Sequence, residues 1–374
     1  MKNIYPQKGL SLVELMVAVT VSLFLVLGIF EIYLSNQGNY KTQKQISRLQ
    51  ENGRYAIHKL TESIRMGGNM GGINNRLAVK AATGVTFSAV SGECYSTGSR
   101  NWSIPMIDTS GIDHPPLLYG TNDTKAPFDS CIATDNYEGG DIISVHYADA
   151  QSFEDDGNSG TAATKVEGSD EDVFKAGTLF IRTDIKETKV FETVTCGGTA
   201  PDLHCDLESN SATASDTAIN SLVKAELFYI RACNDTSSDC VTTNPDNIPT
   251  LVRVSLEPGA SSPVVKHTAL IEGVVSMQIQ YGIDSDNDAL HTIDRYENAS
   301  DGDLGSFITS PRNWSRVKTV RLWLLMRSPE KELGYVDPNA PYTLGDQTVT
   351  VENGYRHMLF TTTVNLRNPG QQTL

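Results

Sequence analysis

Three aspartates at alternate positions, Asp284, Asp286 and Asp288, form the one group of side chains in this sequence whose spacing is typical of metal binding. Alternate carboxylates in a turning loop can converge on a hard cation such as Ca²⁺, which takes about six to eight oxygen ligands. Asp294 follows the three, but Ala289 stands where a calcium loop needs a glycine. The sequence therefore predicts no resident cofactor and leaves two interpretations of this stretch, a calcium site and a solvated β-hairpin loop.

Residues for catalysis are not gathered anywhere along the chain. No H-E-x-x-H, G-x-S-x-G or P-loop motif occurs, and the seven histidines are scattered. We therefore predict that the protein is not an enzyme. The formal net charge of -15 also argues against nucleic-acid binding, because that function depends on Lys and Arg side chains that neutralise phosphates.

A second candidate functional residue is Glu14, a charged side chain inside an apolar run from Gly9 to Leu34. A helix over Leu10 to Leu34 would be about 37 Å long, enough to cross a hydrocarbon core about 30 Å thick. A lone carboxylate in such a segment costs about 2.5 to 3.5 kcal/mol on membrane-insertion scales, so it needs a positive partner. If the chain is cut after Gly9, the new α-amino group of Leu10, in the same chain or in a neighbouring copy, supplies that charge.

The residues around this cut read K-G-L-S-L-V-E-L, with the junction between Gly9 and Leu10. They resemble the class III leader of type IV pilins and pseudopilins, in which a prepilin peptidase cuts after the glycine and methylates the new first residue. Mature pilins usually begin with phenylalanine, whereas Leu10 takes that place here. The resemblance implies a role for Glu14 in assembly. Lys2 and Lys8 precede the apolar run, which predicts a cytoplasmic N-terminus with the remainder of the chain across the membrane.

Three other interpretations of the apolar run explain fewer of its residues. A secretory signal peptide needs an A-x-A-like site after the run, and none follows it. A lipoprotein signal needs a cysteine at the cut, whereas the first cysteine is Cys94. A plain signal anchor remains open, but it gives no reason for Glu14.

All six cysteines lie beyond the apolar run, and their even number is typical of a chain that folds in an oxidising compartment. No C-x-x-C motif occurs, so disulfides are favoured over a metal site. Two pairs would close short loops through turn-forming residues, and the last pair follows by elimination. We therefore predict the disulfides Cys196–Cys205, Cys233–Cys240 and Cys94–Cys131.

A long helix must carry the N-terminal residues. From Ser35 to about Met66 the chain is polar and free of proline, and apolar residues recur in it at helical spacing. This pattern predicts an amphipathic continuation of the membrane helix that ends in the glycine pair Gly67-Gly68.

Strands are predicted for the rest, from runs of β-branched and aromatic residues at 141–147, 178–183, 221–231, 252–256, 274–281, 317–326 and 358–366. The acidic stretch from Gln151 to Asp172 is predicted to be an exposed loop. The expected fold class is α+β, with the polar half of the helix packed on a mainly antiparallel β domain. The predicted organisation is a leader (1–9), a transmembrane helix (10–34), its amphipathic continuation (35–66), a variable β-rich region (67–220) and a C-terminal β-sheet region (221–374).

Three stretches resemble the PilW family of minor type IV pilins: QENGRYAIHKLTESIRMGGNMGG (50–72), MQIQYGIDSDND (277–288) and HMLFTTTVNLRN (357–368). The resemblance implies a subunit that helps initiate pilus assembly and supports pilus-dependent motility and adhesion. Its partners would be prepilin peptidase, other minor pilins and a PilY-type tip protein.

The implied location is the inner membrane of a Gram-negative bacterium, with a single pass and a periplasmic domain, and then the pilus at the cell surface. The large minor pseudopilin of a type II secretion system and a pilus-borne adhesin are the alternatives.

Overall fold

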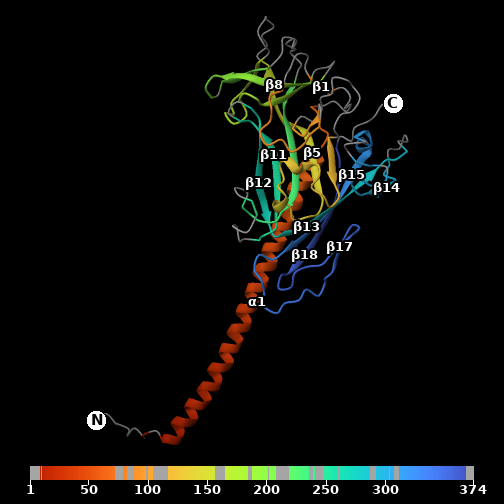
Figure 1. Cartoon of the computed structure of the whole chain (residues 1–374). Helices are drawn as coiled ribbons and strands as arrows, with labels where there is room; N and C mark the ends of the chain where they lie inside the picture. The colour runs from red at the N-terminus through yellow and green to blue at the C-terminus, as the bar shows by residue number, and fades with distance from the viewer. Residues whose placement is uncertain are drawn as a thin grey trace.

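One α-helix, α1 (Leu12–Met66), starts the described chain and runs from a free N-terminal half into a β-rich body (Figure 1). The computed structural model describes residues 9, 11–71, 79–81, 87–97, 100–103, 117–155, 165–183, 188–200, 202–207, 219–235, 239–240, 247–259, 262–286, 292–302, 304–306 and 311–367. The helix has 55 residues, so it is about 82 Å long. Its length and continuity agree with the absence of proline over this stretch.

Capping interactions define both ends of α1. Ser11 is the N-cap, and its Oγ accepts a hydrogen bond from the amide of Val13 at 3.3 Å. At the other end the amide of Gly67 donates to the carbonyl oxygens of Ser63 and Ile64, at 3.1 Å each. Gly68 follows with a φ of 82°, a left-handed conformation that glycine adopts without strain. The predicted helix end at Gly67-Gly68 is confirmed.

The body is built from two larger sheets and two short hairpins. Nine strands follow one another in the first sheet in the order β12-β11-β10-β7-β8-β9-β6-β5-β4, and β1 pairs in parallel with β8. The second sheet has the order β14-β13-β15-β18, and every pairing in it is antiparallel.

The first sheet comprises β1 (Val79–Ala81), β4 (Leu118–Thr121), β5 (Ile142–Asp155), β6 (Lys165–Gly168), β7 (Leu179–Thr183), β8 (Thr188–Gly197), β9 (Leu203–Leu207), β10 (Ile219–Arg231), β11 (Thr250–Glu257) and β12 (Val264–Glu272). The second comprises β13 (Val274–Ile283), β14 (Arg295–Glu297), β15 (Val317–Arg327) and β18 (His357–Asn365). The hairpins are β2 (Ser96–Thr97) with β3 (Arg100–Asn101) and β16 (Tyr342–Leu344) with β17 (Gln347–Val349). Short 3₁₀ turns lie at Phe128–Ser130, Thr134–Asn136 and Pro311–Arg316.

Part of the first sheet closes on itself. Strand β10 pairs with β7 and also with β5, and the path from β7 through β8, β9 and β6 returns to β5. Closure removes free strand edges and encloses a separate apolar cluster that contains Phe153, Phe174, Phe180 and Phe191. This ring of strands forms the end of the body farthest from the N-terminus (Figure 1).

The larger core joins the helix to both sheets. It includes Leu49, Ala56, Leu60 and Ile64 from one face of α1, together with apolar residues of β5, β10, β11, β13, β15 and β18. This arrangement is the expected α+β fold, with the second half of the helix packed on antiparallel strands.

One sequence prediction needs correction. The stretch from Gln151 to Asp172 is not wholly an exposed loop, because β5 continues to Asp155 and β6 covers Lys165–Gly168. Phe153 is buried there in the ring of strands, which explains why a polar segment still forms strands. Strand β10 also crosses the predicted division at residue 220, and residues from both sides of that division share the larger core.

Candidate functional site

The first turn of α1 places Glu14 beside the predicted cleavage point. Ser11 and Glu14 form a capping box, in which the Ser11 amide donates to Glu14 Oε2 at 3.0 Å. Gly9 is exposed, and Leu10 lies outside the described residues. The carboxylate therefore faces the part of the chain where cleavage after Gly9 would create a new α-amino group.

The apolar half of the helix has no cover within this chain. Every residue from Leu12 to Leu34 is exposed, although the most apolar window has a mean hydropathy of 2.5. Two hydroxyl groups in this half are satisfied locally: Thr20 donates to the carbonyl of Val17 at 2.9 Å, and Ser22 to that of Ala18 at 2.7 Å. Among the described residues this is the one helix long and apolar enough to cross a membrane. An exposed apolar helix with its polar groups satisfied is suited to a bilayer or to packing against other helices.

Close packing fixes the second half of α1 to the second sheet. A Cβ built on Gly53 would lie 2.1 Å from Cζ of Phe360, a residue of β18, so the aromatic ring occupies the space that any other residue would need. Leu49, Ala56 and Leu60 are buried on the same side of the helix. The helix and the body consequently form one packed unit.

A buried polar contact fixes the helix to the first sheet. Ser63 Oγ donates to Glu226 Oε2 at 2.6 Å, and Arg253 Nη1 lies 3.2 Å from Glu226 Oε1. Burial, and then the neighbouring Glu226 carboxylate, raise the pKa of the Tyr147 hydroxyl above its usual range. Sequence reasoning missed Glu226, because a charged residue inside the apolar run of β10 gives no indication of its partners on a distant helix and strand.

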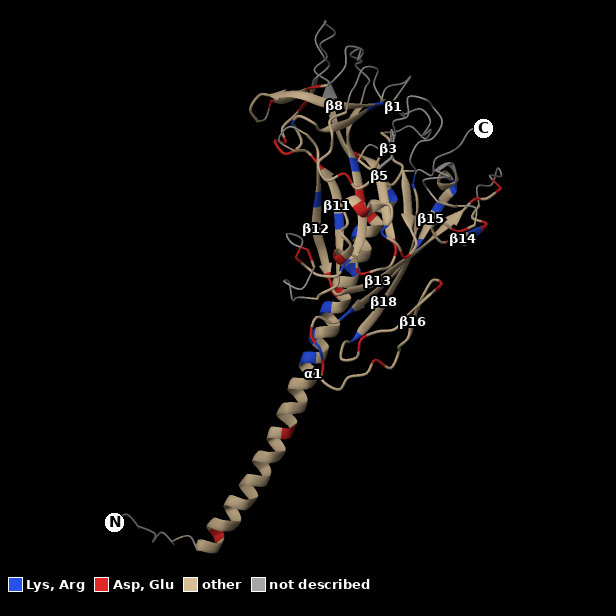
Figure 2. Cartoon of the chain, in the orientation of Figure 1, with Lys and Arg blue, Asp and Glu red and all other residues tan. Residues whose placement is uncertain are grey.

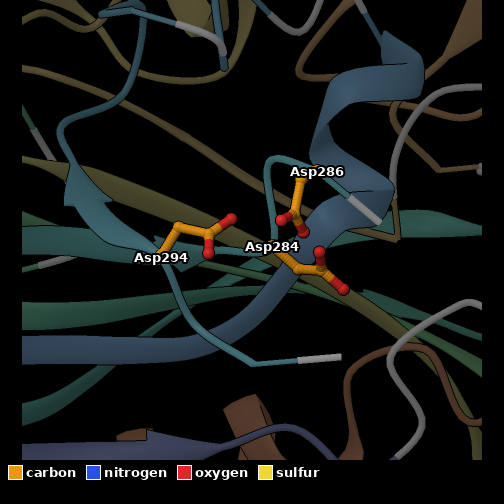
Figure 3. A group of neighbouring side chains, drawn as sticks. All are labelled: Asp284, Asp286 and Asp294. Carbon is orange, nitrogen blue, oxygen red and sulfur yellow. The ribbon is translucent and has the colours of Figure 1, made fainter. Parts of the chain in front are cut away.

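The acidic loop gathers a different set of carboxylates from the one predicted. Asp284, Asp286 and Asp294 have ligand oxygens within 4.8 Å of one another (Figure 3), whereas Asp288 lies outside the described residues. Asp284 is buried, and Lys318 Nζ is 3.8 Å from its Oδ2.

Asp294 is already a hydrogen-bond acceptor. Its Oδ2 accepts from the amide and the hydroxyl of Ser285, each at 2.7 Å. These hydrogen bonds hold the pKa of Asp294 below its usual value. Three carboxylates supply part of a calcium ligand set, and the nearby Lys318 already neutralises some of their charge.

Three disulfides are present, and they join the pairs that the sequence predicts. The bonds are Cys94–Cys131, Cys196–Cys205 and Cys233–Cys240. The second of these links neighbouring strands β8 and β9 in the ring, where Cys196 and Cys205 are directly paired.

The comparisons with known proteins agree with both ends of this arrangement. Residues 238–368 match the family model "Type IV Pilus-assembly protein W", which covers β11 to β18. Residues 5–30 match the "Prokaryotic N-terminal methylation motif", which covers the predicted cleavage point and most of the apolar half of α1. No curated protein and no solved structure matches the chain.

The match at residues 238–368 contains two of the three stretches on which the sequence resemblance rests, 277–288 and 357–368. The third stretch, 50–72, lies between the two matches. The chain therefore carries a type IV pilus-assembly protein W domain, joined through one long helix to a prokaryotic N-terminal methylation motif.

Proposed function

We propose that this type IV pilin-like protein is a minor pilin that helps initiate pilus assembly, in a complex with other minor pilins and a PilY-type tip protein. In this role it supports pilus-dependent motility and adhesion. Prepilin peptidase would process it in the inner membrane, and its body would lie in the periplasm before reaching the cell surface. The pilus-assembly match at residues 238–368 favours a pilus over a secretion system.

The uncovered apolar half of α1 is the observation that carries this proposal. Exposed leucine, valine and phenylalanine side chains on a free helix are unfavourable in water. Other apolar groups must therefore cover them in the working protein. A bilayer covers it before assembly, and helices of neighbouring subunits cover it afterwards. The same segment can therefore serve first as an anchor and then as a contact between subunits.

Glu14 supplies the specific contact in this scheme. Only its Oε2 accepts a hydrogen bond within the described chain, from Ser11, so its Oε1 is free to meet a positive group of another subunit. In an apolar surrounding, a pair formed by this carboxylate and a neighbouring α-amino group is much stronger than in water. Pairing offsets the cost of an isolated carboxylate in the membrane and favours one register between helices.

The direct test compares Glu14→Ala with wild type by co-purification of the other minor pilins and by counts of surface pili. We expect insertion and cleavage to remain, and association to weaken by about 1 to 3 kcal/mol, the typical cost of losing a charge-assisted contact. Glu31→Ala is the matched control, because Glu31 is also an exposed carboxylate of the apolar half but lies far from the cut end. Wild-type levels of both readouts in Glu14→Ala would refute the role of this residue.

Processing gives a separate test. Mass spectrometry of the membrane-extracted protein should find a mature chain that begins at Leu10 and carries one additional methyl group. A chain that still begins at Met1 in peptidase-positive cells, or that is cut beyond Leu34, would contradict a pilin-type subunit.

A further inference from the structure

A polar groove with a volume of about 750 Å³ lies between the last turns of α1 and the edge of the first sheet. One wall is formed by the helix, from Tyr55 to Met66, and the floor by strands β5, β10, β11 and β12. We call this hollow the α1–β12 groove. Its volume is in the range of ordinary ligand-binding pockets, about 300 to 1,000 Å³.

The register of the strands shows how the floor is built, from the buried Phe228 of β10 to the half-buried residues of β12. Phe228 of β10 is paired with Arg253 of β11, which is paired in turn with Thr268 of β12, so these three side chains lie in one row on one face. The helix covers this face over β5 and β10, where Ser63 contacts Glu226. The helix also contacts β12, but most of the residues of that strand are only half-buried, so this end of the face is partly open.

The carboxylates that line the groove are already paired. Glu62 is 3.0 Å from Lys59, Glu226 is 3.2 Å from Arg253, and Asp149 is 3.7 Å from Lys224, a residue outside the lining. Two exposed guanidinium groups of the lining, those of Arg65 and Arg367, form no ion pair with any residue that the structure describes. The groove therefore presents two uncompensated positive charges.

This local charge is opposite to that of the whole chain. The helix wall from Tyr55 to Met66 has two Lys or Arg against one Glu, and the helix from Ser35 to Met66 has six against two, whereas the whole sequence has 30 Lys and Arg against 45 Asp and Glu. Figure 2 shows blue bands on α1 where it enters the body and red bands on its free half. A basic helix wall in an acidic protein favours an acidic partner at that wall.

We propose that the α1–β12 groove receives an acidic peptide segment of a neighbouring subunit. The proposal deepens the assembly function proposed above by naming the chemistry of the partner. Carboxylates of the segment pair with Arg65 and Arg367, because a guanidinium group binds a carboxylate through two parallel hydrogen bonds. Apolar residues of the segment contact Leu270, a half-buried residue of β12 that also lines the groove.

Anionic lipid is a poor occupant on geometric grounds. Arg65 is 31 residues beyond Leu34, so along a continuous helix it lies about 46 Å from the end of the apolar half. The headgroup layer on each side of a bilayer is only about 5 to 8 Å thick. The groove is therefore far from the membrane surface while the apolar half spans the bilayer.

The test uses the purified, detergent-solubilised full chain and two fluorescent probes, a decapeptide of alternating Glu and Leu and a decapeptide of alternating Gln and Leu. Fluorescence anisotropy should show that the Glu peptide binds at least about tenfold more tightly at low salt, and that salt reduces this preference. In the double variant Arg65→Gln/Arg367→Gln, the preference should fall to about twofold or less. Arg54→Gln is the matched control, because Arg54 is an exposed arginine of the same helix outside the groove.

Equal binding of the two peptides by wild type would overturn the proposal, as would an equal loss in Arg54→Gln and in the double variant, which would indicate a diffuse charge effect. The partner is tested by co-purification: the double variant should recover less of the other minor pilins than Arg54→Gln does. If recovery is unchanged while Glu14→Ala still reduces it, the groove assignment fails and the proposed assembly function remains.

Discussion

Gly53 illustrates how a single small residue controls the joint between the helix and the body. Helical glycine ordinarily costs about 1 kcal/mol relative to alanine, and Gly38 in the free part of α1 carries that cost without a contact. At Gly53 the ring of Phe360 occupies the space beside the backbone. Both glycines therefore lower the intrinsic stability of the helix, but only Gly53 leaves space for a neighbouring side chain.

This difference predicts opposite effects of one substitution. Gly53→Ala should destabilise the protein by about 1 to 3 kcal/mol, because the added methyl group displaces Phe360. Gly38→Ala, the control, should be neutral or stabilise by up to about 1 kcal/mol. Urea unfolding of the solubilised chain measures both, and a Gly53→Ala protein as stable as wild type would show that the ring moves away freely.

The acidic loop provides a second prediction for single residues. Calcium binding there should be weak, with a Kd on the order of 10⁻⁴ to 10⁻³ M, because the cluster offers three carboxylates and Lys318 is 3.8 Å from Asp284. Calorimetry at millimolar calcium should detect heat for wild type that Asp286→Ala removes and Asp202→Ala keeps. Absence of heat for wild type would leave the solvated loop as the interpretation.

Between elements, Asp141 forms a polar link between the two sheets. It lies just before β5, and its carboxylate accepts hydrogen bonds from the amide of Ile279 in β13 at 2.6 Å and from that of Asp123 at 3.0 Å. The side chain is 1% exposed. Burial raises the pKa of Asp141 to about 8, and the two amide donors oppose this shift without cancelling it.

The raised pKa predicts a pH dependence of stability. Between the usual pKa of 3.8 and the folded value of about 8, the folded state binds more protons at Asp141 than the unfolded state does. The contribution of this group is therefore fully present below about pH 4 and is lost as pH rises toward 8. Urea unfolding at pH 5 and pH 8 should show a larger loss for wild type than for Asp141→Asn, and equal losses would contradict the shift.

The sequence was sufficient to predict the elements with strong patterns. The helix end at Gly67-Gly68 follows from periodicity and two glycines, and strands such as β10 and β15 follow from dense β-branched and aromatic residues. The ring of strands was not predictable, because β6 has only four residues and its pairing with β9 depends on contacts distant in sequence. The α1–β12 groove was missed for the same reason, since Arg65 and Arg367 are 302 positions apart.

At the scale of the whole molecule, the disulfides constrain loops of very different length. Cys94–Cys131 closes a separation of 37 residues, whereas Cys233–Cys240 closes a separation of 7. A longer closed loop removes more conformational entropy from the unfolded chain. Cys94 and Cys233 are both buried, and Cys131 and Cys240 are both half-buried, so the two bonds are similar in burial.

Replacing each pair by serine should therefore have unequal effects. Loss of Cys94–Cys131 should cost about 4 kcal/mol and loss of Cys233–Cys240 about 2 kcal/mol, as the loop-entropy relation gives for these separations. Guanidinium unfolding under non-reducing conditions compares the two double variants. A smaller loss for the longer loop would mean that the unfolded chain is already compact between Cys94 and Cys131.

The exposed part of α1 also sets the distance between the apolar half of the helix and the body. Thr42 is the first residue of the helix that the body partly covers, so only Ser35 to Lys41, about 10 Å of helix, separates the apolar half from the body. This length is close to the thickness of one headgroup layer, about 5 to 8 Å. In the membrane-anchored state proposed above, a body held so near the bilayer diffuses in two dimensions at a nearly constant height. Partners anchored in the same way would then contact its sides rather than its far end.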